Sequence, residues 1–169
     1  SALTYNKTNK LLEQGRYYYG GILTNQTTNQ EFSDFAVEQI HNVDVATTYH
    51  GEPSAQVCDL LLNKNGKLYI ATSSQNPFFK DLIKLPKVIV NDYKGNGTID
   101  SCGFSIRGTI QNVGHEYIDE NFEKTLLNEI YADNVEAAKE DLRVLEITPL
   151  EAGYLDHRTH PIFMQKFKF

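Results

Sequence analysis

Residues 45–93 constrain the fold more than any other part of the sequence. They hold three short apolar-rich runs that are separated by tight polar turns at residues 50–53 and 63–66, followed by one short amphipathic helix. Apolar runs that alternate with such turns form consecutive antiparallel strands. We therefore predict a β-meander with strands at residues 45–49, 54–62 and 67–72.

Hydroxyl and amide side chains gather where the third predicted strand ends and the helix begins. Thr72, Ser73, Ser74 and Asn76 occupy this junction, and Pro77 stands in the first helical turn. Side chains of this kind beside the free N–H groups of a helix start are suited to holding an anion. We therefore expect an anion-binding site here.

Three segments have the spacing of amphipathic helices. Ser33 is predicted to cap a helix that runs to about residue 40, after a polar surface loop at residues 24–31. The helix after Thr72 has one apolar face and ends at Pro86. A longer helix is predicted from about residue 116 to residue 131, with one face formed by Tyr117, Phe122, Leu126, Leu127 and Ile130.

The remaining apolar runs have the character of β-strands, and strands do not alternate regularly with helices along the chain. This order favours an antiparallel barrel of six or seven strands with helical additions, in a single domain of residues 1–169. Residues 1–32 form an N-terminal extension in which Leu11 and Leu12 are compatible with a short helix and residues 17–19 with an extended piece. The further strands are predicted at residues 87–93, 103–113, 142–148 and, as an edge strand, 163–169.

The charge of the chain argues against nucleic acid as a partner. Sixteen Lys and Arg residues stand against 22 Asp and Glu residues, the net charge is −6, and no short window concentrates basic side chains. No apolar run approaches the ~20 residues that span a bilayer. Cys58 and Cys102 lie in predicted strands rather than in a disulfide framework, which favours reduced thiols over a disulfide between adjacent strands. We therefore expect a soluble, cytoplasmic protein with reduced thiols and no membrane partner.

Several short motifs follow one another in an order that resembles the FMN-binding split barrels related to pyridoxamine 5'-phosphate oxidase. The resemblance covers roughly residues 33–148 and is moderately specific as a whole. It implies a fold that is mainly β with helices, a split β-barrel of about six antiparallel strands. The matching positions are Ala46-Thr47, Gly51-Glu52-Pro53, Gly66, Tyr69-Ile70-Ala71-Thr72, Leu82, Pro86 and Ile106-Arg107-Gly108.

The resemblance also implies a cofactor and an assembly. In the family, FMN lies between the two subunits of a homodimer and carries the redox chemistry, so no catalytic acid, base or nucleophile is predicted. By position, the residues that would lie along the flavin or near its phosphate are Gln56, Val57, Cys58, Asp59, Ala71, Thr72, Ser73, Ser74, Asn76 and Lys80.

The sequence departs from the oxidase at the phosphate. Gln56, Pro77 and Phe78 stand where the oxidase has cations, so three charge-assisted contacts to the phosphate are lost. Lys80 is the remaining nearby cation, and residues 76–80 resemble a different, haem-utilisation-like or uncharacterised branch. Two functions are therefore open: an FMN-dependent oxidoreductase acting on an unknown small molecule, or a non-enzymatic split barrel that binds haem, another flavin-like ligand or no cofactor.

A short segment near the C-terminus is the one local match to the segment with which the oxidase binds its substrate. The chain has no Trp, and residues 157–161 read His-Arg-Thr-His-Pro. By the resemblance, Arg158 would face a ligand from the partner subunit. His157 and His160 lack a third ligand at an evident spacing, so no metal site is predicted.

Overall fold

The structure is a computed structural model that describes residues 21–95 and 97–169. The predictions for Leu11, Leu12 and residues 17–19 lie outside the described residues. Every helix in the described part of the chain is too short or too polar to cross a bilayer.

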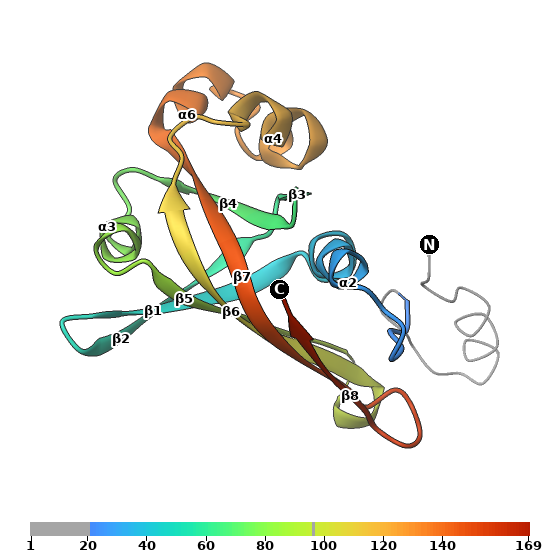
Figure 1. The fold of residues 1–169 in the computed structure, drawn as a ribbon. Helices are drawn as coiled ribbons and strands as arrows, with labels where there is room; N and C mark the ends of the chain where they lie inside the picture. Colours follow the sequence, from blue (N-terminus) through green and yellow to red (C-terminus); the bar gives the residue numbers. More distant parts are fainter. Residues whose placement is uncertain (1–20, 96) are drawn as a thin grey trace.

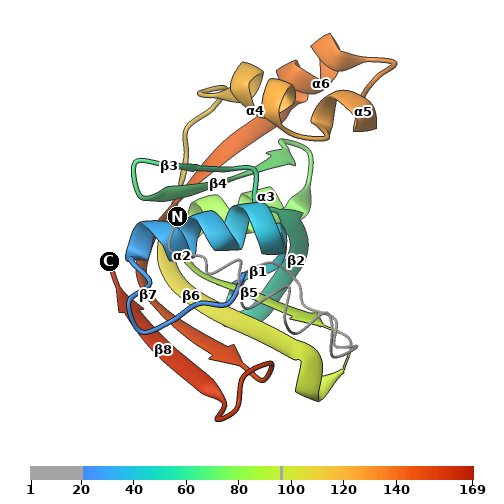
Figure 2. The same ribbon diagram turned by 90° about the vertical axis from the view of Figure 1, so that its right-hand side faces the viewer.

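Eight antiparallel strands form one strongly curved sheet that does not close (Figures 1 and 2). The strand order is β2-β1-β5-β6-β7-β4-β3, and β8 pairs with β7. The mainly-β, split-barrel prediction is therefore confirmed. The strands are β1 (Asn42–Tyr49), β2 (Glu52–Asp59), β3 (Leu62–Lys64), β4 (Lys67–Ser73), β5 (Lys87–Gly95), β6 (Ser101–Asn112), β7 (Leu142–Asp156) and β8 (Phe163–Lys168).

The predicted meander is correct in its first hairpin and wrong in its second. β1 pairs with β2 along its whole length, but β4 pairs with β3 and β7 and not with β2. The predicted strand 54–62 ends at Asp59, because Leu60 is buried in the barrel core whereas Leu61 and Leu62 are buried in a second core. Three consecutive buried leucines cannot alternate between two faces of one strand. The sheet is therefore split between β2 and β4.

The first described helix begins earlier than predicted. α2 (Asn29–Phe35) is capped by Thr28, whose hydroxyl accepts from the N–H of Glu31 at 3.2 Å, as in a capping box. The predicted cap, Ser33, lies buried inside α2, and a short π-helix, η1 (Ala36–Ile40), continues it. α2 lies across the concave face of the sheet (Figure 2).

The helix predicted after the third strand is confirmed as α3 (Pro77–Lys84). Asn76 caps it, and its side chain accepts from the N–H of Phe78 at 3.0 Å. Phe78, Phe79 and Leu82 are buried in the barrel core. α3 therefore closes one end of the barrel next to the predicted anion site.

The long helix predicted for residues 116–131 is broken, and a further helix follows it. α4 (Ile118–Lys124) ends at Thr125, whose hydroxyl donates to the carbonyl of Asn121, and side-chain bonds of this kind compete with the helix. α5 (Leu127–Ile130) and α6 (Val135–Asp141) complete the connection between β6 and β7. These helices, which we call the cap, lie beyond β4 at one end of the sheet (Figure 1).

A buried ion pair holds the opposite end of the sheet. Arg158 and Asp156 are both buried, and the guanidinium donates to the carboxylate from Nε and Nη2, each at 2.9 Å. Nη2 also donates to the carbonyl of Gly21 at 3.1 Å and to the hydroxyl of Tyr154 at 3.2 Å. Arg158 therefore serves the interior of its own chain, and the expectation that it faces a ligand from a partner is wrong.

Arg158→Ala should destabilise the protein by about 3–5 kcal/mol, because it leaves the buried carboxylate of Asp156 without its partner. Urea unfolding followed by circular dichroism measures the loss. Lys124→Ala is the control, since the exposed Lys124 forms an i,i+4 pair with Glu120 on α4 at 2.6 Å, and its loss should cost less than about 1 kcal/mol. Equal losses for the two variants would contradict the prediction.

Candidate functional site

The predicted flavin residues of β2 line one cleft. Gln56, Val57, Cys58 and Asp59 form one wall along the edge of the split sheet, and Ala71 of β4 lies across from them. The cleft has a volume of about 190 Å³. Its remaining lining comes from Leu61 and from the cap residues Leu127, Ile130 and Tyr131.

A network of neutral polar groups joins this cleft to the start of α3. The amide nitrogen of Asn76 donates to the side-chain oxygen of Gln56 at 2.9 Å and to the hydroxyl of Thr72 at 3.2 Å. Thr72 is buried at the end of β4. The network ties β2, β4 and α3 together at the open side of the barrel, which fixes the shape of the cleft.

The turn after β4 is bonded to a carboxylate of the cap. Ser74 donates from its hydroxyl to Oδ1 of Asp141 at 2.9 Å, and its N–H donates to the Asp141 carbonyl at 3.2 Å. The hydroxyl of Ser73 and then that of Ser74 hold the pKa of Asp141 below its usual value. The predicted anion site therefore contains an anion supplied by the chain itself.

The remaining candidate cation, Lys80, is not among the residues that form the cleft. It is on the exposed surface of α3. Gln56, Pro77 and Phe78, the positions where the oxidase has cations, bring no charge to the turn. The structure thus brings the ring-side candidates together in one cleft. Of the phosphate-side candidates, Ser73 and Ser74 bond to Asp141, whereas Asn76 bonds to Gln56 and Thr72.

Cys58, a side chain of the cleft, has a raised pKa, and His41 lies beside its neighbour Asp59. Burial, followed by the nearby carboxylates of Asp59 and Asp44, raises the pKa of Cys58 to about 12. The Nε2 atom of His41 lies 3.9 Å from Oδ1 of Asp59. Cys58 is therefore a neutral thiol at physiological pH and a poor nucleophile.

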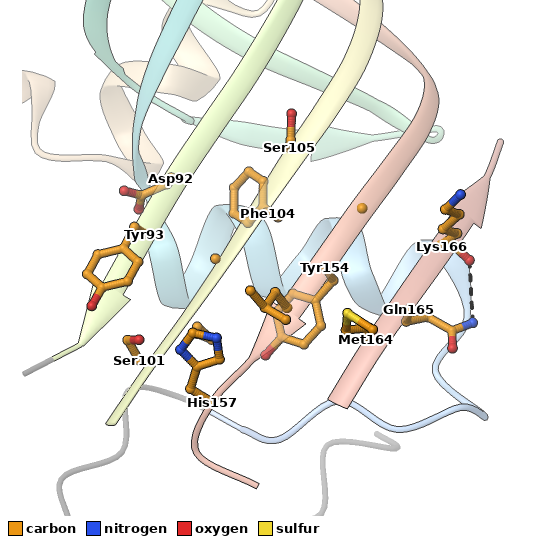
Figure 3. Close-up of a pocket in the computed structure, with 14 residues that line it drawn as sticks. Asp92, Tyr93, Ser101, Phe104, Ser105, Tyr154, His157, Met164, Gln165 and Lys166 are labelled. Atoms are coloured by element: carbon orange, nitrogen blue, oxygen red, sulfur yellow. Dashed lines mark hydrogen bonds between the residues drawn. The ribbon is translucent and has the colours of Figure 1, made fainter. Parts of the chain in front are cut away.

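A larger hollow lies on the outer face of the sheet, over β5 to β8 (Figure 3). Its volume is about 660 Å³, and its exposed apolar side chains are Tyr93, Leu155 and Met164, with exposed fractions of 56%, 38% and 73%. Gly153 contributes to its lining, and a Cβ added there would meet no atom within 4 Å. Smaller hollows of about 230 and 510 Å³ continue along the same face through Arg107 and Leu150.

Sequence reasoning missed the contribution of the cap to the cleft. The predicted helix 116–131 assigned Leu126, Leu127 and Ile130 to one buried face, yet Leu126 and Ile130 are 58% and 60% exposed. The helix breaks at Thr125, so α4 and α5 do not share one continuous apolar face, and Leu127 is buried while Leu126 and Ile130 are exposed.

The reactivity of Cys58 should follow its raised pKa. In a Cys102→Ser variant, the rate of alkylation by iodoacetamide should rise about tenfold per pH unit between about pH 8 and pH 10, because only the thiolate reacts. The same variant in urea is the control, and its rate should level off near the ordinary thiol pKa of about 8.5. A plateau in the folded protein above about pH 9 would refute the expectation.

Solved bacterial structures share this architecture at low sequence identity. A Clostridium acetobutylicum protein related to general stress protein 26, of the pyridoxinephosphate oxidase family, has a TM-score of 0.62 and 19% identity, covering 83% of this chain and 94% of that one. A haem-binding protein from Mycobacterium smegmatis has a TM-score of 0.61 and 14% identity, and the match covers 87% of this chain and 60% of that one. A FAD-binding protein from Mesorhizobium loti has a TM-score of 0.56 and 9% identity, and the match covers 73% of this chain and 91% of that one.

No protein-family model and no curated protein sequence matches the chain. The comparison therefore rests on structure, and at these identities it concerns the fold. The chain shares its overall architecture with these solved structures. It combines the curved open sheet with the cap and with the cleft between β2 and β4. The chain has the split-barrel fold of the pyridoxamine 5'-phosphate oxidase-like proteins.

Proposed function

We propose that the protein is a flavin-binding split barrel, with FMN as the flavin that its sequence motifs imply, and an oxidoreductase that acts on a small molecule as a homodimer. The cleft carries the proposal. Residues from β2 and β4 that the sequence assigned to the flavin line one cavity with the cap. A FAD-binding protein with the same fold adds support.

The lining of the cleft fits the ring of a flavin. Val57, Ala71 and Ile130 offer apolar contact, and Tyr131 offers an aromatic surface. The side chains of Gln56 and Asp59 can hydrogen-bond a polar ring edge. The turn at Ser73 and Ser74 does not fit a phosphate in the same way, because Asp141 already occupies it.

The size of the cleft supports a site shared between two subunits. Its 190 Å³ is below the range of about 300–1,000 Å³ that ligand pockets usually have. A second copy that packs on the outer face of the sheet and extends to the open side of β2 would enlarge and cover it. Val57 lies on that side and is 70% exposed.

The outer face of the sheet is the surface that we propose for the dimer. Tyr93, Leu155 and Met164 gather there on neighbouring strands, and Leu150 continues the exposed apolar surface. Apolar patches of this kind on soluble proteins mark interaction sites.

A bound flavin would supply the hydride or electron transfer, and the chain would orient it and limit the access of water. The neutral Cys58 thiol would add no competing nucleophile beside the ring. Both described cysteines are free thiols, which suits a reducing, cytoplasmic setting.

Haem is the second candidate ligand. Haem iron takes an axial ligand such as imidazole, and the Nε2 atom of His41 lies 3.9 Å from Asp59, a residue that lines the cleft. A haem-binding protein shares the fold. Titration with haemin, followed by its Soret band, in the wild type and His41→Ala separates this candidate from a flavin.

Ile130→Asp should weaken FMN binding at least about tenfold, because it places a charge at the apolar wall of the cleft. Quenching of flavin fluorescence measures the dissociation constant. Leu126→Asp is the matched control, since Leu126 is equally exposed on the cap but does not line the cleft. If both variants bind FMN with the same dissociation constant as the wild type, the flavin lies elsewhere. If the wild type does not bind FMN, the proposed function is refuted.

The double variant Leu155→Arg and Met164→Arg should convert the dimer to a monomer, because it buries like charges against each other in the proposed interface. Light scattering after size-exclusion chromatography reports the mass. Ile83→Arg, at an exposed apolar residue of α3 away from this face, is the control and should remain dimeric. A monomeric wild type, or a dimeric double variant, would refute the interface.

A further inference from the structure

The position of Asp141 follows from the sheet itself. Asp141 is the last residue of α6, and the next residue, Leu142, stands opposite Ser73 in the ladder between β4 and β7. This register places the carboxylate beside the turn, where Ser73 and Ser74 donate to it and the N–H of Ser74 bonds its carbonyl. The pairing of β4 with β7 therefore fixes the backbone of Asp141 beside this turn.

The other donors of the turn are also engaged. The N–H of Gln75 donates to the hydroxyl of Ser73 at 3.1 Å, and its side-chain amide donates to the hydroxyl of Ser74 at 3.3 Å. At the start of α3, Pro77 has no N–H, while Phe78 and Phe79 donate to the side chain and the carbonyl of Asn76. The usual helix-start donors for a phosphate are thus bonded within the chain.

The basic side chain nearest in sequence does not replace them. Arg143 donates from Nη1 to the carbonyls of Glu140, Asp141 and Leu142. Its charge favours the ionised form of Asp141 and so helps to keep a carboxylate at this place. A dianionic phosphate entering the turn would meet a negative charge and would have to displace its hydrogen bonds.

We infer that Asp141 is a specificity-determining residue that selects against a phosphate at this end of the site, so that the protein takes a flavin whose side chain ends in a hydroxyl at least as readily as FMN. The inference rests on the proposed function. A terminal hydroxyl of the flavin side chain can donate a hydrogen bond to the Asp141 carboxylate. A phosphate is negatively charged like the carboxylate, so the two groups repel each other. The ligand class is therefore a neutral, dephosphorylated flavin such as riboflavin.

Binding of riboflavin and of FMN to the wild type, Asp141→Asn and Glu136→Gln tests this. The wild type should bind riboflavin as tightly as FMN or more tightly. Asp141→Asn keeps an oxygen that can accept from Ser74 but removes the charge, so it should gain at least about tenfold in affinity for FMN and change by less than about twofold for riboflavin. Glu136→Gln removes the same charge from the exposed side of α6 and should change neither affinity.

Wild-type binding of FMN more than about tenfold tighter than riboflavin would overturn the inference, as would equal gains in Asp141→Asn and Glu136→Gln. If neither flavin binds the wild type, the proposed function fails, and inorganic phosphate then decides the role of Asp141. Amide shifts of Ser73 and Ser74 that saturate with phosphate in Asp141→Asn alone would support that role. Shifts in the wild type as well, or in neither protein, would refute it.

Discussion

The register of β7 is the constraint on which the rest of the structure depends. This strand of 15 residues pairs with β4 through its first half, with β6 along nearly its whole length, and with β8 through its second half. A bulge at Arg107 and Gly108 lets β6 follow it, and Gly108 is needed there because a Cβ would lie 2.6 Å from the carbonyl of Thr148. The same register places the cap beside β4 and Asp141 beside Ser74.

Much of the fold was predictable because its signals are local. Polar turns and alternating apolar residues identified the hairpin of β1 and β2, and Pro77 and Pro86 bounded α3. The split was not predictable in this way, since Leu60 and Leu61 look like a continuing strand until two separate cores are known to receive them. The start of α2 could have been found, because Thr28 and Glu31 have the spacing of a capping box.

The candidate site likewise has one part that local sequence signals predict and another part that they do not. The residues proposed for the flavin ring lie on β2 and β4, where the resemblance to the split barrels assigns positions by local motifs, and the structure gathers those residues in one cleft. The part of the site at the turn after β4 and at the cap depends on contacts between residues far apart in the sequence, which no local pattern predicts. The bond between Ser74 and Asp141 joins residues 67 positions apart, and Tyr131 reaches the cleft through a helix break at Thr125.

The connection between β6 and β7 has a consequence for how such a protein can diversify. Residues 113–141 supply the wall of the cleft from α5 and the carboxylate at the end of α6, yet none of them belongs to a strand of the sheet. The cap packs mainly on its own core with Tyr69 and Val144, apart from the core that holds the barrel together. If the cleft binds the proposed ligand, substitutions in residues 113–141 can change its wall while the strand pairing and the barrel core stay as they are.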